Sequence, residues 1–221
     1  MHNKNKNFSH GIIPKKFFKL KENNVTMVNY IKPTDNEKQS RYYNMMTRCY
    51  NANYYNKSLN YKDCKVCSEW QDRKNFYDWM DNNFYAIPNK DGISEKIELD
   101  KDLLIPSNKI YAPDRCLFLP KEINNTVGSY IPSLLKTDDG YLLRNPAYTK
   151  SIGEYPNKED IVKEFSLKKS NELIQLAEKY KNYIPTKVYD AIIDASEIIL
   201  EYNLYKLKQG QIKVYNQSLD L

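Results

Sequence analysis

The chain has 221 residues, of which 41% are hydrophobic and 28% are charged, and its formal net charge is +6. That length allows one large domain or two small ones. No apolar run reaches membrane-spanning length and no secretory signal is recognisable, so we expect a cytoplasmic protein with no membrane partner.

Positive charge is concentrated in the first part of the chain. Residues 1–60 hold eleven Lys and Arg against three acids, a net of +8, which leaves the remainder at −2. Such a segment suggests a polyanionic partner, most simply double-stranded DNA bound through its phosphates by side chains such as Lys15 and Lys16. It is also typical of a solvated, partly disordered leader. We take residues 1–36 as this basic leader, with a short strand at 25–31.

A first small domain is predicted over 37–128. Apolar residues at helical spacing predict one helix over 36–50 and another near 75–83. The elements expected after them are two strands and a short helix or turn, at 98–104, 110–119 and 122–125. Strand, strand and helix in this order predict a compact ββα unit.

A second domain, with a small sheet, a helix and further C-terminal helices, is predicted over 129–221. Asp138-Asp139-Gly140 marks a turn near its start. The elements expected after this turn are strands at 141–144 and 149–155, long helices at 158–182 and 186–204, and a candidate strand at 212–215. Pro156 and Pro185 stand where the two helices begin. The whole chain is therefore expected to be α+β.

Two acids flank a lysine in the stretch 98–125. Asp100 and Asp102 carry carboxylate oxygens, which are the ligands that a hard divalent cation such as Mg²⁺ or Mn²⁺ prefers. Aspartate beside Pro and Asn is also a common turn residue, so the same acids could close a short strand. The spacing alone leaves both interpretations open.

Four blocks of the chain resemble the motif of HNH endonucleases from phages and prophages. They are Tyr43-Asn44-Met45-Met46-Thr47-Arg48-Cys49-Tyr50, Cys64-Lys65-Val66-Cys67-Ser68-Glu69-Trp70, Leu99-Asp100-Lys101-Asp102 and Asn108-Lys109-Ile110-Tyr111. The similarity runs from about residue 42 to residue 125. It implies a metal-dependent DNA endonuclease acting in a bacterial host cell. The residues that would form its catalytic set are Asp100, Lys101, Asp102 and Asn108, with Arg48 and Lys109 as DNA contacts.

The chain departs from that motif at two positions. HNH sites use a histidine as the general base, and Lys101 stands in its place, whereas Cys116 stands where the family has a metal-binding asparagine. Lysine is protonated at neutral pH unless it is strongly desolvated, so it is a poor default base and would stabilise charge instead. Two functions therefore stay open. One is a DNA endonuclease, and the other is a catalytically inactive HNH fold that regulates by binding DNA or inhibits a host defence protein.

All four cysteines, Cys49, Cys64, Cys67 and Cys116, lie in the HNH-like region. Cys64 and Cys67 have the spacing of a zinc knuckle, and the other two could complete a tetrahedral site. Many HNH nucleases support their small core with such a zinc ion. Four reduced thiols that pack as small apolar side chains are the alternative. A disulfide framework is disfavoured, because a chain of this length should build a core without one.

The second domain resembles the Apetala-type DNA-binding domain that often follows the nuclease motif in phage HNH proteins. The matching blocks are Gly140-Tyr141-Leu142, Ser151-Ile152-Gly153-Glu154-Tyr155, Ala177-Glu178-Lys179-Tyr180-Lys181 and Ile184-Pro185-Thr186-Lys187-Val188-Tyr189-Asp190-Ala191. The resemblance implies a small sheet that faces DNA and is packed on one helix. Arg144, Tyr148 and Lys150 are the candidate DNA contacts in this domain. A sheet that reads a DNA sequence needs several side chains that reach the edges of the bases.

Overall fold

The computed structural model describes residues 28–55, 61–88, 94–128 and 130–216, which form helices and small sheets of the expected α+β class. The helices are α1 (Asp35–Tyr50), α2 (Ala52–Tyr55), α3 (Ser68–Gln71), α4 (Arg73–Asn83), α5 (Lys121–Val127), α6 (Pro146–Ile152), α7 (Lys158–Tyr180) and α8 (Thr186–Lys208). The strands are β1 (Asn29–Tyr30), β2 (Lys65–Val66), β3 (Tyr85–Pro88), β4 (Ser94–Glu95), β5 (Ile97–Asp100), β6 (Ile110–Tyr111), β7 (Leu117–Pro120), β8 (Leu134–Lys136), β9 (Tyr141–Leu143) and β10 (Val214–Asn216). Among these described helices, none has the length and apolar character needed to cross a membrane.

Local capping sets the starts of the predicted helices. Before α1, the Thr34 hydroxyl accepts a hydrogen bond from the Glu37 amide at 3.3 Å, while the Glu37 carboxylate accepts one from the Thr34 amide at 2.8 Å. This reciprocal capping box satisfies two amides that a helix start otherwise leaves unpaired. Asp72 and Asn157 cap α4 and α7 with their side-chain oxygens. The four long predicted helices are confirmed, and α8 extends to Lys208.

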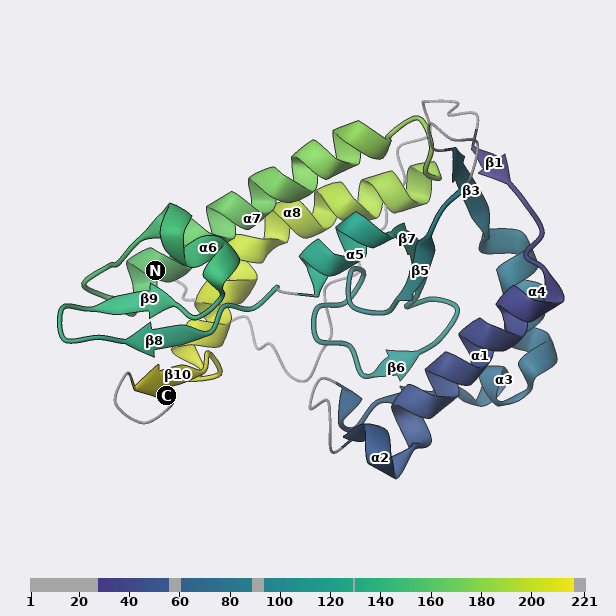
Figure 1. The fold of residues 1–221 in the computed structure, drawn as a ribbon, viewed down its shortest axis with the longest axis horizontal. Coiled ribbons are helices and arrows are strands. Elements are labelled where there is room, and N and C mark those ends of the chain that lie inside the picture. The colour runs from purple at the N-terminus through teal and green to yellow at the C-terminus, as the bar shows by residue number, and fades with distance from the viewer. Residues whose placement is uncertain (1–27, 56–60, 89–93, 129, 217–221) are drawn as a thin grey trace, which may run out of the picture.

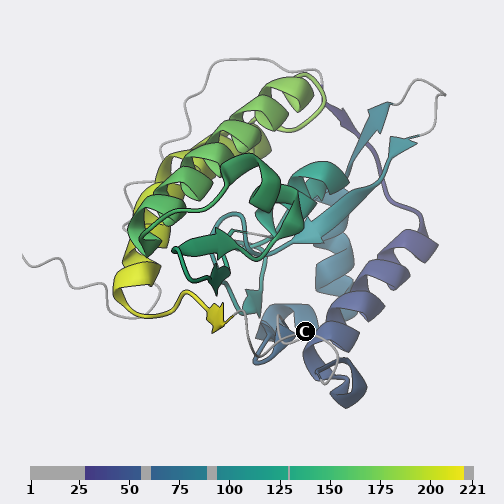
Figure 2. The same ribbon diagram turned by 60° about the vertical axis from the view of Figure 1, so that its left-hand side comes forward.

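The long hairpin of α7 and α8 lies along one side of the molecule (Figure 1). At one end it carries a three-stranded sheet in the order β10-β8-β9. The unit formed by β5, β7 and α5 lies beneath its middle, and α1, α3 and α4 lie beyond that unit, as the second view shows (Figure 2). The hairpin therefore links the two regions that the sequence predicts as separate domains.

Buried side chains form two hydrophobic clusters, and both helices of the hairpin contribute to each. The main core combines Trp70, Phe76 and Phe118 with residues of the hairpin such as Leu173 and Ile192. The small core lies under the three-stranded sheet, where Leu134, Leu143, Ile161, Val162, Phe165 and Ile212 are buried against each other. Burying one such side chain stabilises the fold by roughly 1.5–3 kcal/mol. Helical residues from beyond 128 thus complete the core of the first predicted domain.

The strand predicted at 149–155 is wrong. Residues 146–152 form α6, and only Tyr155 makes an isolated antiparallel bridge, to Tyr141. Pro146 occupies the first position of this helix, where its missing amide hydrogen costs nothing, and the Asn145 carbonyl accepts from the amides of Tyr148 and Thr149. The third strand of the sheet comes instead from β10, which pairs in parallel with β8. The sheet is therefore completed by a contact between segments that lie far apart in the chain.

Two other strand predictions hold only in part. The single strand expected at 110–119 consists of two strands that belong to different sheets, β6 paired with β2 and β7 paired with β5. The turn at 113–115 separates them. Of the strand expected at 25–31, β1 covers Asn29–Tyr30, and residues 25–27 lie outside the described residues.

Candidate functional site

The predicted catalytic residues lie at the end of β5, in a unit of two strands and a helix. β5 and β7 pair antiparallel, with Ile97 opposite Pro120 and Asp100 opposite Leu117, and α5 follows β7 directly. The loop 101–116 between the strands contains β6, whose parallel pairing with β2 anchors it. The chain therefore brings Asp100, Lys101 and Asp102 together with Asn108 of the same loop.

Asp100 acts as the closing residue of a turn. Its side chain is buried, and its Oδ1 accepts hydrogen bonds from the amides of Asp102 at 3.0 Å and Leu103 at 2.7 Å. Burial, with a smaller effect of the Asp102 charge, raises the pKa of Asp100 to about 7. Of the two interpretations left open by the sequence, this geometry corresponds to the turn.

Lys101 is held in a closed set of polar contacts. The residue is only 4% exposed, and its Nζ donates to both carboxylate oxygens of Asp102, at 2.7 and 2.8 Å, and to the carbonyl oxygen of Asn108 at 2.8 Å. An ammonium has three hydrogens and no lone pair, so these contacts use its whole donor capacity. The lysine that the motif resemblance predicts in place of a general base is thus buried and paired with its own carboxylate.

Asn108 holds the loop in place from the inside. Its Nδ2 donates to the carbonyl oxygens of Lys101 at 2.9 Å and Ile110 at 2.7 Å, and its Oδ1 accepts from the Ile110 amide at 3.0 Å. The side chain is 5% exposed. These contacts join both ends of residues 101–110, so Asn108 orders this turn.

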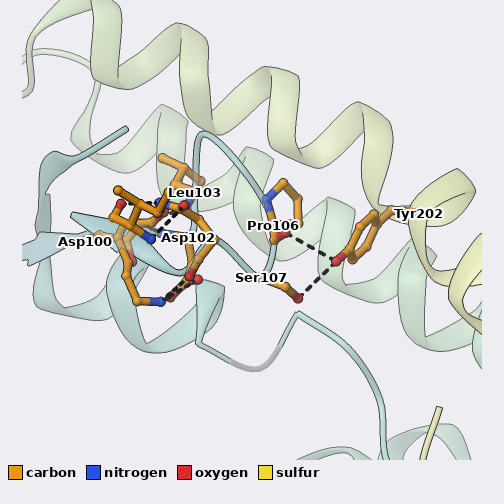
Figure 3. A network of polar contacts seen from close by, with 9 residues as sticks. Asp100, Asp102, Leu103, Pro106, Ser107 and Tyr202 are labelled. Atoms are coloured by element: carbon orange, nitrogen blue, oxygen red, sulfur yellow. Dashed lines mark hydrogen bonds and ion pairs between the residues drawn. The ribbon is translucent and has the colours of Figure 1, made fainter. Parts of the chain in front are cut away.

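The sequence gives no sign of Tyr202, which ties this loop to α8 (Figure 3). Its hydroxyl lies 3.0 Å from the Ser107 Oγ and 3.3 Å from the Pro106 carbonyl oxygen. Ser107 adopts the left-handed conformation with φ of 62°, which places the loop against the helix. A tyrosine 95 positions away on an amphipathic helix carries no local signal of this contact.

The four cysteines belong to the main core. Cys49, Cys64 and Cys116 are buried, Cys67 is half-buried, and all four are free thiols. Burial raises the pKa of Cys49 to about 12 and also raises the pKa of Cys64 and Cys116. Without a bound cation, these buried thiols are therefore held in the protonated form. Among the residues that the structure describes, no three His, Cys, Asp or Glu side chains form a group that could hold a metal ion. The structural zinc ion stays a prediction.

We expect one thiol of the native protein to react quickly with a disulfide reagent such as Ellman's reagent, and all four to react after unfolding. Cys67 is the reactive one, because the other three are covered by core side chains. A chelator should leave unchanged both the rate of this reaction and the number of thiols that react in the native protein. Slow reaction of every thiol, followed by release of zinc and rapid reaction when a chelator is added, would instead establish the zinc site.

The candidate DNA contacts are placed in different regions. Arg48 is half-buried, and its guanidinium lies 5.2 Å from the centre of the Tyr61 ring. Lys109 is exposed on the loop of the ββα unit, whereas Arg144 and Lys150 are exposed beside the three-stranded sheet. Lys15 and Lys16 lie outside the described residues.

Comparison of the chain with protein-family models, with curated proteins and with solved structures found no match. Interpretation of the site therefore depends on its motif and on its geometry.

Proposed function

We propose that this chain is a DNA-binding protein of the phage HNH type in which the ββα unit serves as a scaffold and does not cleave DNA. The observation that carries the proposal is the burial of Lys101 against Asp102 and Asn108. A general base must accept a proton, and a cation that donates to three oxygens has no site to accept one.

The two acids support the same proposal, because three of their four carboxylate oxygens already accept hydrogen bonds. Asp100 caps two backbone amides, and both oxygens of Asp102 accept from Lys101. Catalysis by Mg²⁺ needs carboxylate oxygens that are free to take the ion and turned toward a scissile phosphate. In this arrangement the acids do not fit such a site, so no hydrolytic step is assigned to it.

Binding to DNA is supported by the charge distribution. Residues 1–60 carry a net charge of +8, and the remainder of the chain carries −2. A polyanion should therefore be held mainly through the first part of the chain, by contacts between cations and phosphates. Such contacts release counterions, so the affinity should fall steeply as salt is added.

The test combines plasmid cleavage with DNA binding, using the full chain beside Asp100→Ala. We expect no nicking of supercoiled plasmid by either protein with Mg²⁺ or Mn²⁺. Both should retard a duplex in a mobility-shift assay, and raising salt from about 50 to 200 mM should weaken binding by at least about tenfold.

Nicking by the wild-type protein that disappears in Asp100→Ala would contradict the proposal and establish an endonuclease that works without the usual histidine. Absence of both nicking and binding at low salt would also contradict it, and would favour the role of an inhibitor that binds a host protein.

A further inference from the structure

The outer face of α7 carries two exposed aliphatic side chains. Leu167 is 50% exposed and Ile174 is 40% exposed, and their spacing of seven residues places them two turns apart on one side of the helix. Phe165 and Tyr180 lie on the opposite side, where they are buried in the small core and the main core. The helix forms the upper edge of the molecule in Figure 1, with α8 below it. Aliphatic residues at heptad spacing are the type of seam along which two helices pack.

A shallow groove runs beside Leu167, between the end of α6 and the outer face of α7. Its volume is about 530 Å³, and Ser151 of α6 lines it together with residues of α7 that include Leu167, Asn171 and Gln175. The surface next to Leu167 is therefore hollowed. An aliphatic side chain from another molecule has room to lie against Leu167 there.

The charges on this face are arranged so that the face complements itself. Asp160 and Lys163 precede Leu167 by seven and four residues, and Glu178 and Lys181 follow Ile174 by four and seven residues. If a second α7 is laid antiparallel on the first, Leu167 of each copy meets Ile174 of the other. Each acid then meets a lysine, whereas a parallel pairing would bring like charges together.

Within one chain, these charged groups make only exposed ion pairs. The Lys163 Nζ lies 3.1 Å from the Glu159 carboxylate, and the Lys181 Nζ lies 2.7 Å from the Glu178 carboxylate. Exposed ion pairs contribute little to stability, so they can be exchanged for pairs with another chain at small cost. The aliphatic pair supplies the gain, because contact between two copies removes apolar surface from water.

We propose that this face of α7 binds a second copy of the chain, giving a two-fold symmetric dimer with antiparallel α7 helices. Leu167 of each copy packs on Ile174 of the other, and Lys163 of each pairs with Glu178 of the other. A two-fold axis places the same patch on both sides of an interface, as a self-complementary face requires. The inference goes beyond the proposed function and does not depend on it, since no DNA takes part.

The experiment is sedimentation equilibrium of the full chain without DNA. We expect a monomer–dimer equilibrium with a dissociation constant of about 1–100 μM, because the face is small. Leu167→Glu should weaken the dimer by about tenfold or more, since it places two charges at the centre of the interface. Tyr43→Glu is the matched control, because it adds the same charge at a position of α1 that is 66% exposed. It should leave the dissociation constant nearly unchanged.

An exchange of charges tests the antiparallel arrangement itself. Lys163→Glu and Glu178→Lys should each weaken the dimer, because each variant makes like charges meet. The double variant should restore it, since every contact then joins a lysine and a glutamate again. Positions 163 and 178 are about 22 Å apart along α7 at 1.5 Å per residue, so the restoration cannot come from a contact within one chain. The melting temperature of each variant, measured by circular dichroism, reports whether the fold is kept.

A wild-type protein that stays monomeric up to about 200 μM would overturn the proposal, because that concentration exceeds the expected dissociation constant. So would equal effects of Leu167→Glu and Tyr43→Glu. Single charge variants that weaken the dimer without restoration in the double variant would also overturn it, because the two residues would then not face each other.

Discussion

Asp100→Asn should make the protein more stable than the wild type above about pH 7 and equally stable below about pH 4. The carboxyl of Asp100 has a raised pKa in the folded protein, so the folded state binds its proton more tightly than the unfolded chain. Its contribution to stability is fully present below the ordinary pKa of 3.8 and is lost as the pH rises through about 7. An amide keeps the Oδ1 acceptor for the amides of Asp102 and Leu103 but never ionises.

The difference between Asp100→Asn and wild type should grow between these limits to at most about 4 kcal/mol, since one pKa unit is worth about 1.4 kcal/mol. Urea unfolding of both proteins at several pH values measures it. Asp139→Asn, at an exposed position in the β8–β9 turn, is the control and should show no such trend. A difference that stays constant with pH would show that the buried carboxyl does not titrate as this environment requires. Binding of duplex DNA should survive Asp100→Asn if the unit is a scaffold.

Asn108→Ala should destabilise the protein by about 2–4 kcal/mol. The substitution removes three hydrogen bonds and leaves the carbonyl oxygens of Lys101 and Ile110 and the Ile110 amide without the partner that ordered them. Each buried polar group that loses its partner costs roughly 1–3 kcal/mol, and part of this is recovered where water can enter. Denaturant unfolding monitored by tryptophan fluorescence measures the change, because Trp70 and Trp79 pack in the main core near this unit.

Ser107→Ala is the matched control for that substitution. Ser107 is the preceding residue and is exposed, and its hydroxyl contacts the Tyr202 hydroxyl. Its removal should cost less than about 1 kcal/mol. If the two variants were equally stable, the loop would not depend on the asparagine, and the ordering role of Asn108 would be wrong.

The long helices were predictable because their signals are local. The capping box at Thr34 and Glu37, the Asn157 cap and the proline before α8 each lie within one turn of the helix that they start. The strand predicted at 149–155 was wrong, because residues 146–152 form a helix. The Asn-Pro pair at 145–146, which starts a helix, was the stronger local signal.

Pairings between distant segments were not predictable from one sequence. β10 pairs with β8 only because the α7–α8 hairpin returns the chain to the sheet. β6 is close to β7 in the sequence but pairs with β2. Such contacts depend on burial over the whole molecule, and each short strand has too few residues to specify its partner.

The sequence by itself determined the α+β class, the order of the ββα elements, the residues gathered at the end of β5, and the turn as one of two roles for Asp100. Each of these depends on residues close together along the chain. Only the tertiary structure decided that Lys101 is buried in an ion pair with Asp102, that Tyr202 hydrogen-bonds to the loop, and that the cysteines pack in the core. Burial and ion pairing are set by the segments that close over a residue, and here those segments include helices almost a hundred positions away.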